Sequence, residues 1–265
     1  MPVEEVSATQ QETVAAFVEA SDRRGRAAPV RRQFVQGGRQ GVAVPGPLSA
    51  IVRSRDEIAL DLYLLHRARA SSSPFDVAAH SAVWARAVGL GGEERSGSAA
   101  VSKAWRRLED KYHLVRRDRR GRLAKVVALR EDGSGKPYVV PTGGSWSDRY
   151  FKIPFAYWLN EDQWHSTLSL RGKAALLIAL SLPSTFTLPA ERAPAWYGIS
   201  ADTIERGLRE LADRGALSRS LRVRKAPLSP AGKTRVAEYT RLGSFAPSAK
   251  PSPARQRLVA VGDVA

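Results

Sequence analysis

Hydrophobic residues predict the same order of elements in two stretches of the chain. In the first stretch, about 51–130, apolar runs that begin near Arg55, His80 and Ser98 predict three helices, the second of which ends at Gly91. The sequence LVRRDRRGRLAKVVALRE follows and is typical of a hairpin whose turn contains a glycine. This stretch therefore predicts three helices and two strands.

The second stretch, about 150–242, repeats that order. SLRGKAALLIALSL predicts a helix with Ser169 as its N-cap, and PAERAPAWYG predicts a short helix. A third helix starts after a second N-cap, Ser200. LSRSLRVRKAPL and TRVAEYTRL then predict two strands.

The third helices of the two stretches can be laid over each other without a gap. Apolar residues then coincide at i, i+4, i+7 and i+13, and the first three share one helical face. The aligned pairs are Val101 and Ile204, Trp105 and Leu208, Leu108 and Leu211, and Leu114 and Leu217. The match favours two copies of one module; chance similarity between amphipathic helices is the alternative.

Three further segments have little apolar periodicity. Residues 1–50 are rich in arginine, glycine and glutamine after a short helix near 12–20, and predict a mobile basic arm. Such an arm either contacts a DNA backbone or minor groove, or is a solvated tail. Residues 131–149 contain glycines and prolines and predict a linker, and residues 243–265 predict a Pro/Ser-rich disordered tail.

The segment ISADTIERGLRELADRGAL resembles the third helix of bacterial winged helix-turn-helix DNA-binding proteins. It has a serine N-cap, a threonine three residues later, Arg-Gly in mid-helix, Leu-x-x-Leu and a Gly-x-Leu turn. YFKIPFAYW, followed by SLRGKAALLIALSL, is similar to the lead-in of winged-helix proteins from plasmids and mobile elements of high-GC bacteria, which include regulators and replication initiators. The resemblance covers 150–242 and is weaker over 51–130, where Tyr112 replaces Gly215.

This resemblance implies an α+β fold, mainly α, with two winged-helix domains in tandem. The expected organisation is a basic arm, domain 1, a linker, domain 2 and a tail, over 1–50, 51–130, 131–149, 150–242 and 243–265.

Composition favours a polyanionic partner. The 265 residues carry a formal charge of +16, for which nucleic acid is the usual partner, an acidic membrane surface is the alternative, and a merely cationic soluble protein is the third interpretation. The chain lacks an apolar run of about 18 residues, and acidic residues near its start argue against a secretory signal. We expect a cytoplasmic, nucleoid-associated protein that does not span a membrane.

Enzyme, metal and cofactor chemistry find little support in the sequence. There are no cysteines, the four histidines are scattered, and the acidic residues show no metal-binding spacing. Gly232-Lys233-Thr234 resembles the end of a phosphate-binding loop, but Pro227 stands where the earlier glycine is required. We expect no enzyme activity, no metal and no cofactor.

The second stretch offers one set of candidate DNA contacts. A recognition helix lies in the major groove, where arginine can bond guanine O6 and N7, and Arg206 is the leading candidate for base readout. Ser200 and Thr203 could hold a phosphate at the helix start. The full set is Ser200, Ala201, Asp202, Thr203, Arg206 and Arg209 on the helix, and Arg222 and Arg224 on the wing.

The first stretch offers a more basic set. A wing of this kind would follow phosphates or enter a minor groove, and its binding would depend on salt because counterions are released. A solvated charged face is the other interpretation. The candidates are Ser98, Ser102, Lys103, Arg106 and Arg107 on the helix, and Arg116, Arg117, Arg119, Arg120 and Arg122 on the hairpin.

Together these patterns predict a sequence-specific protein that binds double-stranded DNA, with a transcriptional regulator favoured. A plasmid-type replication initiator that binds origin repeats shares the same features. A non-specific DNA-coating or protein-recruiting scaffold is the alternative from another class. The tails could contact a replisome, a polymerase or another partner protein, and a homodimer is also open.

Overall fold

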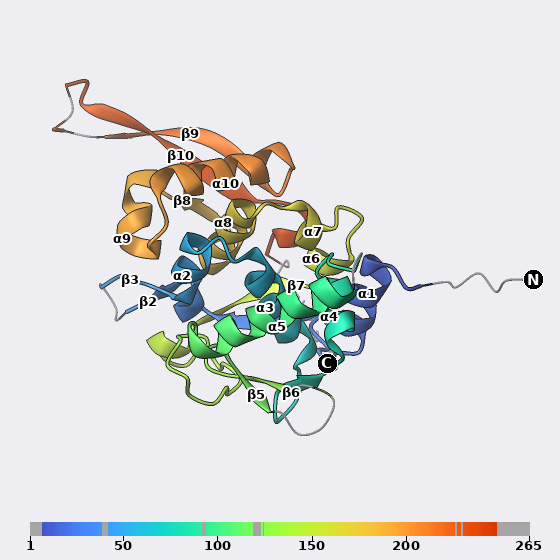
Figure 1. Ribbon diagram of the computed structural model, residues 1–265. Helices are drawn as coiled ribbons and strands as arrows, with labels where there is room; N and C mark the ends of the chain where they lie inside the picture. The colour runs from blue at the N-terminus through green and yellow to red at the C-terminus, as the bar shows by residue number, and fades with distance from the viewer. Residues whose placement is uncertain are drawn as a thin grey trace, which may run out of the picture.

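Two parts of the chain fold with the same order of elements in the computed structural model (Figure 1). The structure describes residues 7–38, 42–91, 94–118, 123, 125–225, 227–228 and 230–247. The first unit comprises α3 (Glu57–Arg69), β4 (Asp76–Ala78), α4 (Ser81–Ala87), α5 (Glu94–Asp110), β5 (Val115–Asp118) and β6 (Lys125–Ala128). The second unit comprises α8 (Leu170–Ser181), β8 (Thr185–Thr187), η3 (Ala190–Arg192), α9 (Ala193–Tyr197), α10 (Ala201–Asp213), β9 (Leu217–Lys225) and β10 (Lys233–Arg241).

Each unit has a three-stranded antiparallel sheet with the same strand order. The orders are β4-β6-β5 and β8-β10-β9, so the last strand lies in the middle in both. The hairpins differ in length, since β5 and β6 have 4 residues each and β9 and β10 have 9 each. Figure 1 shows the β9–β10 hairpin projecting from the body of the molecule.

The aligned apolar residues of α5 and α10 are all buried, which confirms the predicted inward face of each helix. The largest exposed fraction among them is 4%, at Trp105. Ser169 and Ser200 cap α8 and α10 as predicted, because each side chain accepts a hydrogen bond from the N–H three residues later.

Gly207 lets α10 approach α8 closely. A Cβ at this position would lie 2.4 Å from the carbonyl oxygen of Arg171 and 2.8 Å from the Cβ of Ala175. The aligned residue of α5 is Ala104, which is fully buried. A glycine in mid-helix costs about 1 kcal/mol against alanine, and close helix packing accounts for it here.

The segment expected to be a mobile arm is folded over its described part. It forms α1 (Gln10–Glu19), β1 (Ala27–Arg31), η1 (Arg32–Phe34), β2 (Gln36–Gly37), β3 (Val44–Pro45) and α2 (Pro47–Arg53). Val14, Val18, Val30 and Phe34 are fully buried. The arm prediction was wrong because β1 gains its partner far away in sequence, in β7 (Tyr150–Pro154), which short-range periodicity does not reveal.

The segment expected to be a linker is a packed connection that contains η2 (Trp146–Asp148). Glu131 is fully buried and accepts a hydrogen bond of 2.7 Å from Arg31. Asp148 accepts hydrogen bonds from Thr142 and Gly143. Burial raises the pKa of Asp148, but these hydrogen bonds and that of Arg31 outweigh it and lower the pKa to about 2.

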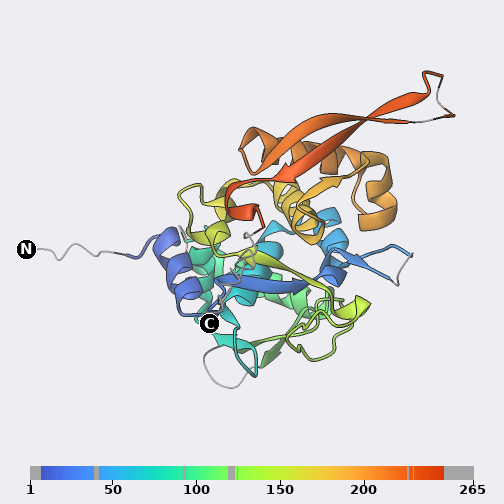
Figure 2. The ribbon, with the colours of Figure 1, turned by 180° about the vertical axis from the view of Figure 1, so that it is seen from behind.

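The two units share one hydrophobic core, so they are not separate bodies on a flexible link. Figure 2 shows β1 and β7 side by side between the two units. The shared core also includes residues of α6 (Ala156–Leu159) and α7 (Trp164–Thr167). Lys173 of α8, only 2% exposed, forms ion pairs with Glu57 and Asp61 of α3.

The predicted C-terminal tail begins with a folded turn. This is η4 (Gly243–Phe245), in which Phe245 is buried against the ring of Trp164. The rest of the predicted tail, 248–265, lies outside the described residues. Within the part that the structure describes, no helix is long and apolar enough to cross a membrane. The fold is of the α+β class, as expected.

Candidate nucleic-acid interface

The outer face of α10 carries an alternation of acidic and basic side chains. Arg206 Nε lies 2.8 Å from Asp202 Oδ1, and Arg209 Nη2 lies 3.2 Å from Glu205 Oε1. All four side chains are more than half exposed. Exposed pairs of this spacing contribute about 0.3–0.5 kcal/mol, so an anionic ligand could replace either acid at little cost.

The other predicted residues of this helix lie at its start. Ser200 is exposed and serves as N-cap, and its hydroxyl also donates a hydrogen bond of 2.8 Å to the hydroxyl of Thr203. Thr203 and Ala201 are half-buried. The structure therefore places Arg206 and Arg209 on the exposed face of α10 and Ser200 at its N-cap, with the exposed charge concentrated in the arginines and their acidic neighbours.

Grooves lie on both sides of α10, and Arg209 lines both. The first, about 780 Å³, runs between α10 and the start of α8 and is also lined by Arg171, Arg206 and Arg214. The second, about 550 Å³, lies between α10 and β9 and is also lined by Arg219. Four arginines and two acids, Glu210 and Asp213, line the first groove, and this excess of positive charge suits an anionic backbone.

Arg171 and Arg214 were missed from the sequence. Arg214 donates a hydrogen bond of 2.7 Å to the Thr167 hydroxyl and lies over the ring of Trp164. Arg171 is 48% exposed and lies 3.8 Å from Glu210. Arg214 follows the end of α10, and Arg171 lies in the first turn of α8. Only tertiary packing places these two residues beside Arg206.

The long hairpin of the second unit is predominantly basic. Arg222 pairs with Glu238 at 3.1 Å and remains 61% exposed, and Arg224 is exposed. Glu238 is the one acid in these two strands; the further cations are Arg219, Lys225, Lys233, Arg235 and Arg241. This hairpin can therefore follow an anionic polymer beyond the edge of the body.

In the first unit, α5 exposes Ser102, Lys103 and Arg106, and Ser98 is half-buried. Arg107 is held elsewhere, since its Nε and Nη2 donate hydrogen bonds of 2.5 and 2.6 Å to Asp56, the N-cap of α3. Burial raises the pKa of Asp56, but Arg107 outweighs this effect and the pKa lies below its usual value. A contact from Arg107 to DNA would have to break this pair.

The residue of α10 aligned with Arg107 is Glu210, and it performs the same task with the opposite charge. Its carboxylate accepts a hydrogen bond of 2.7 Å from the Ser169 N–H and another from the Ser169 hydroxyl. Ser169 is the N-cap of α8, as Asp56 is of α3. The same position therefore ties each third helix to the start of the first helix of its unit.

The predicted hairpin residues of the first unit divide into three cases. Arg116 is exposed. Arg117 is only 10% exposed and pairs with Glu109 at 2.6 Å, so it faces α5. Arg119, Arg120 and Arg122 lie outside the described residues.

Comparison of the chain with protein-family models, curated proteins and solved structures gave no match. Among the described residues, no group of three or more histidine or acidic side chains is placed to hold a metal ion.

Proposed function

We propose that the two units are winged-helix domains and that the protein binds double-stranded DNA in a sequence-specific manner, as a transcriptional regulator. The observation that carries this proposal is the repeated order of helix, strand, helix, helix and hairpin, with the last strand central in both sheets. In each unit the third helix exposes basic residues next to its hairpin.

In this proposal α10 enters the major groove. Arg206 and Arg209 exchange their exposed partners, Asp202 and Glu205, for guanine edges or phosphates. The acids also restrain non-specific attraction, because they remain on the helix and their negative charges repel phosphates. Arg171 and Arg214 follow the adjacent backbone along the groove beside α10.

The β9–β10 hairpin acts as the wing, with Arg222 and Arg224 on phosphates. In the first unit Lys103, Arg106 and Arg116 make the equivalent contacts. Since the two units share a core, the spacing between their DNA sites is fixed by the protein. A fixed spacing fits a target with two half-sites, and in this respect origin repeats and operators are equivalent.

The proposal is tested by selecting bound duplexes from a random library at near-physiological salt. We expect a motif with two half-sites, and the positions of the motif in the genome then separate promoters from a replication origin. Strong, salt-sensitive binding without a motif would contradict sequence-specific recognition and favour a DNA-coating scaffold.

A further inference from the structure

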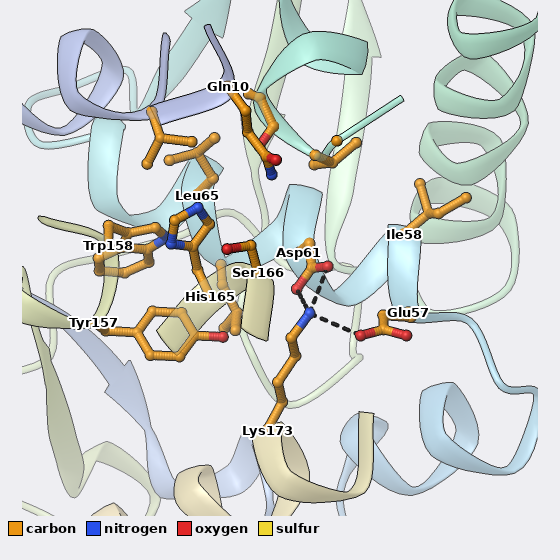
Figure 3. A pocket seen from close by; sticks show the side chains of 15 residues that line it. Gln10, Glu57, Ile58, Asp61, Leu65, Tyr157, Trp158, His165, Ser166 and Lys173 are labelled. Carbon is orange, nitrogen blue, oxygen red and sulfur yellow. Dashed lines mark hydrogen bonds and ion pairs between the residues drawn. The ribbon is translucent and has the colours of Figure 1, made fainter. Parts of the chain in front are cut away.

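A cavity of about 390 Å³ lies between the two units, where α8 meets α3. It is lined by residues of α1, α3, α6, α7 and α8, together with the end of α4, and it is partly open to solvent (Figure 3). Its size falls within the range of small-molecule sites in proteins, about 300–1,000 Å³.

Two side chains of the cavity wall are buried with unused hydrogen-bonding atoms. Tyr157 is 2% exposed and His165 is 7% exposed. Within the described part of the chain, the Tyr157 hydroxyl has no hydrogen-bond partner. The His165 ring has one neighbouring acceptor, the backbone carbonyl of Tyr157, which leaves its other nitrogen unused. Figure 3 shows the Tyr157 hydroxyl directed toward the side of the cavity where Lys173 lies, and the His165 ring beside Trp158 and Leu65. Buried polar atoms without partners destabilise a fold, so a bound partner would account for them.

The opposite wall carries an unequal ion cluster. Lys173 Nζ lies 2.8 Å from Glu57 Oε1 and 2.7 Å from Asp61 Oδ2. Two carboxylates against one ammonium leave one negative charge. Burial raises the pKa of Asp61 to about 6 against the opposing effect of Lys173, so the carboxylate is ionised at neutral pH.

The cavity wall supplies no second cation to balance this cluster. Burial, and then the charge of Lys173, lower the pKa of His165 to about 4, against the opposing effect of the Tyr157 backbone carbonyl. The ring is therefore neutral at pH 7, and the nitrogen that does not face this carbonyl is an acceptor. The remaining lining is largely apolar and includes Val14, Ile58, Leu65 and Trp158.

We infer that this cavity binds a small organic cation. Its ammonium group lies at Glu57 and Asp61, its apolar body packs against Ile58 and Leu65, and the Tyr157 hydroxyl and His165 complete its polar contacts. The cavity shares Ser166 with the groove beside α10, but none of the arginines of that groove lines the cavity.

The site is tested on the full chain without DNA. The three probes each have a phenyl ring on a short side chain and differ in the charge of the terminal group. These are phenethylamine, which is a cation, 2-phenylethanol, which is neutral, and phenylacetate, which is an anion. Saturation-transfer NMR and thermal unfolding measure binding. We expect phenethylamine to bind most tightly and phenylacetate not to bind. Affinity for the amine should rise with pH through about 6, as Asp61 ionises beside Glu57 and Lys173.

Two variants locate the site. Glu57→Gln removes one negative charge, while Lys173 keeps its ion pair with Asp61. The variant should bind phenethylamine about tenfold more weakly and 2-phenylethanol with unchanged affinity. Tyr157→Phe removes an unpartnered hydroxyl and should leave the fold intact. Its affinity for phenethylamine should be about fivefold lower. Glu191→Gln, at an exposed acid of η3, is the matched control and should change nothing.

Three results would overturn the inference: none of the three probes binds, the amine and the carboxylate bind equally, or the amine binds Glu57→Gln and Tyr157→Phe as tightly as the parent protein. Urea unfolding curves serve as the control, because they check that each variant is folded under the conditions of the binding measurement.

Discussion

In the first unit a positive charge ties the third helix in place, whereas in the second unit a negative charge does so. Arg107 of α5 binds the carboxylate that caps α3, and Glu210 of α10 binds the N–H and hydroxyl of the serine that caps α8. The comparison shows that this position holds the helix, whatever its charge. A basic residue on a predicted recognition helix is therefore not by itself a candidate DNA contact.

The two units also differ in what surrounds the third helix. α10 lies between two grooves and next to a hairpin of 9-residue strands, whereas the strands that follow α5 have 4 residues each. The more basic sequence belongs to the first unit, but the larger surface for a long anionic polymer belongs to the second. We therefore propose that α10 reads the stronger half-site and α5 the weaker one.

The largest effect is expected where the two units meet. Lys173→Met leaves Glu57 and Asp61 facing each other without a cation, and should lower the free energy of unfolding by about 3 kcal/mol. Urea unfolding followed by tryptophan fluorescence measures this. Lys152→Met, at an exposed lysine of β7, is the control and should change the free energy by less than about 0.5 kcal/mol. Equal effects would mean that the two units are not joined through Lys173.

A smaller effect is expected at the two helix ties. Asp56→Asn should cost about 2 kcal/mol, because it weakens a charged pair on a buried carboxylate, and Glu210→Gln about 1 kcal/mol. The folded pKa of Asp56 lies below its unfolded value, so its stabilisation is complete above about pH 4 and disappears as pH falls through the folded pKa. The difference in free energy of unfolding between Asp56→Asn and the parent protein should therefore shrink as the pH is lowered. A difference that stays constant with pH would argue against the ion pair.

The two third helices, α10 and α5, are expected to differ in how much each contributes to the preference for one DNA sequence over another. Arg206→Ala should reduce the preference for the selected motif over a scrambled duplex by about 1–3 kcal/mol. Lys103→Ala, at the aligned position of α5, should reduce this preference less than Arg206→Ala does. Fluorescence anisotropy with the two duplexes measures both variants. A uniform loss with Arg206→Ala would remove base readout from α10.

The smallest effect is expected at the hairpins. Replacing Arg222 and Arg224 together with alanine should reduce the slope of log affinity against log salt by about one for each phosphate that the protein no longer neutralises. Arg116→Ala, on the short hairpin, should change the slope by about one or less. The same anisotropy titration repeated at several salt concentrations gives these slopes. An unchanged slope in the double variant would show that the long hairpin does not touch the backbone.

The sequence predicts what local patterns determine. The inward faces of α5 and α10 and the N-caps Ser169 and Ser200 follow from helical spacing and capping chemistry, and the structure confirms them.

Contacts between distant residues were not predictable in this way. Arg107 and Asp56 lie 51 positions apart, and Arg31 and Glu131 lie 100 apart. Neither pair leaves a periodic signal. The pairing of β1 with β7 was missed for the same reason, and with it the fact that the residues before Arg53 belong to the core.

The most direct test of the central claim uses the absence of cysteine from the chain. Glu205→Cys on α10 and Ser102→Cys on α5 are exposed, aligned positions that can each carry a photo-crosslinker. Glu19→Cys, exposed at the end of α1, is the control. We expect position 205 to crosslink to bases within the selected motif, and position 102 to the same duplex at a second site. Crosslinking at both positions no greater than that from position 19 would contradict the account.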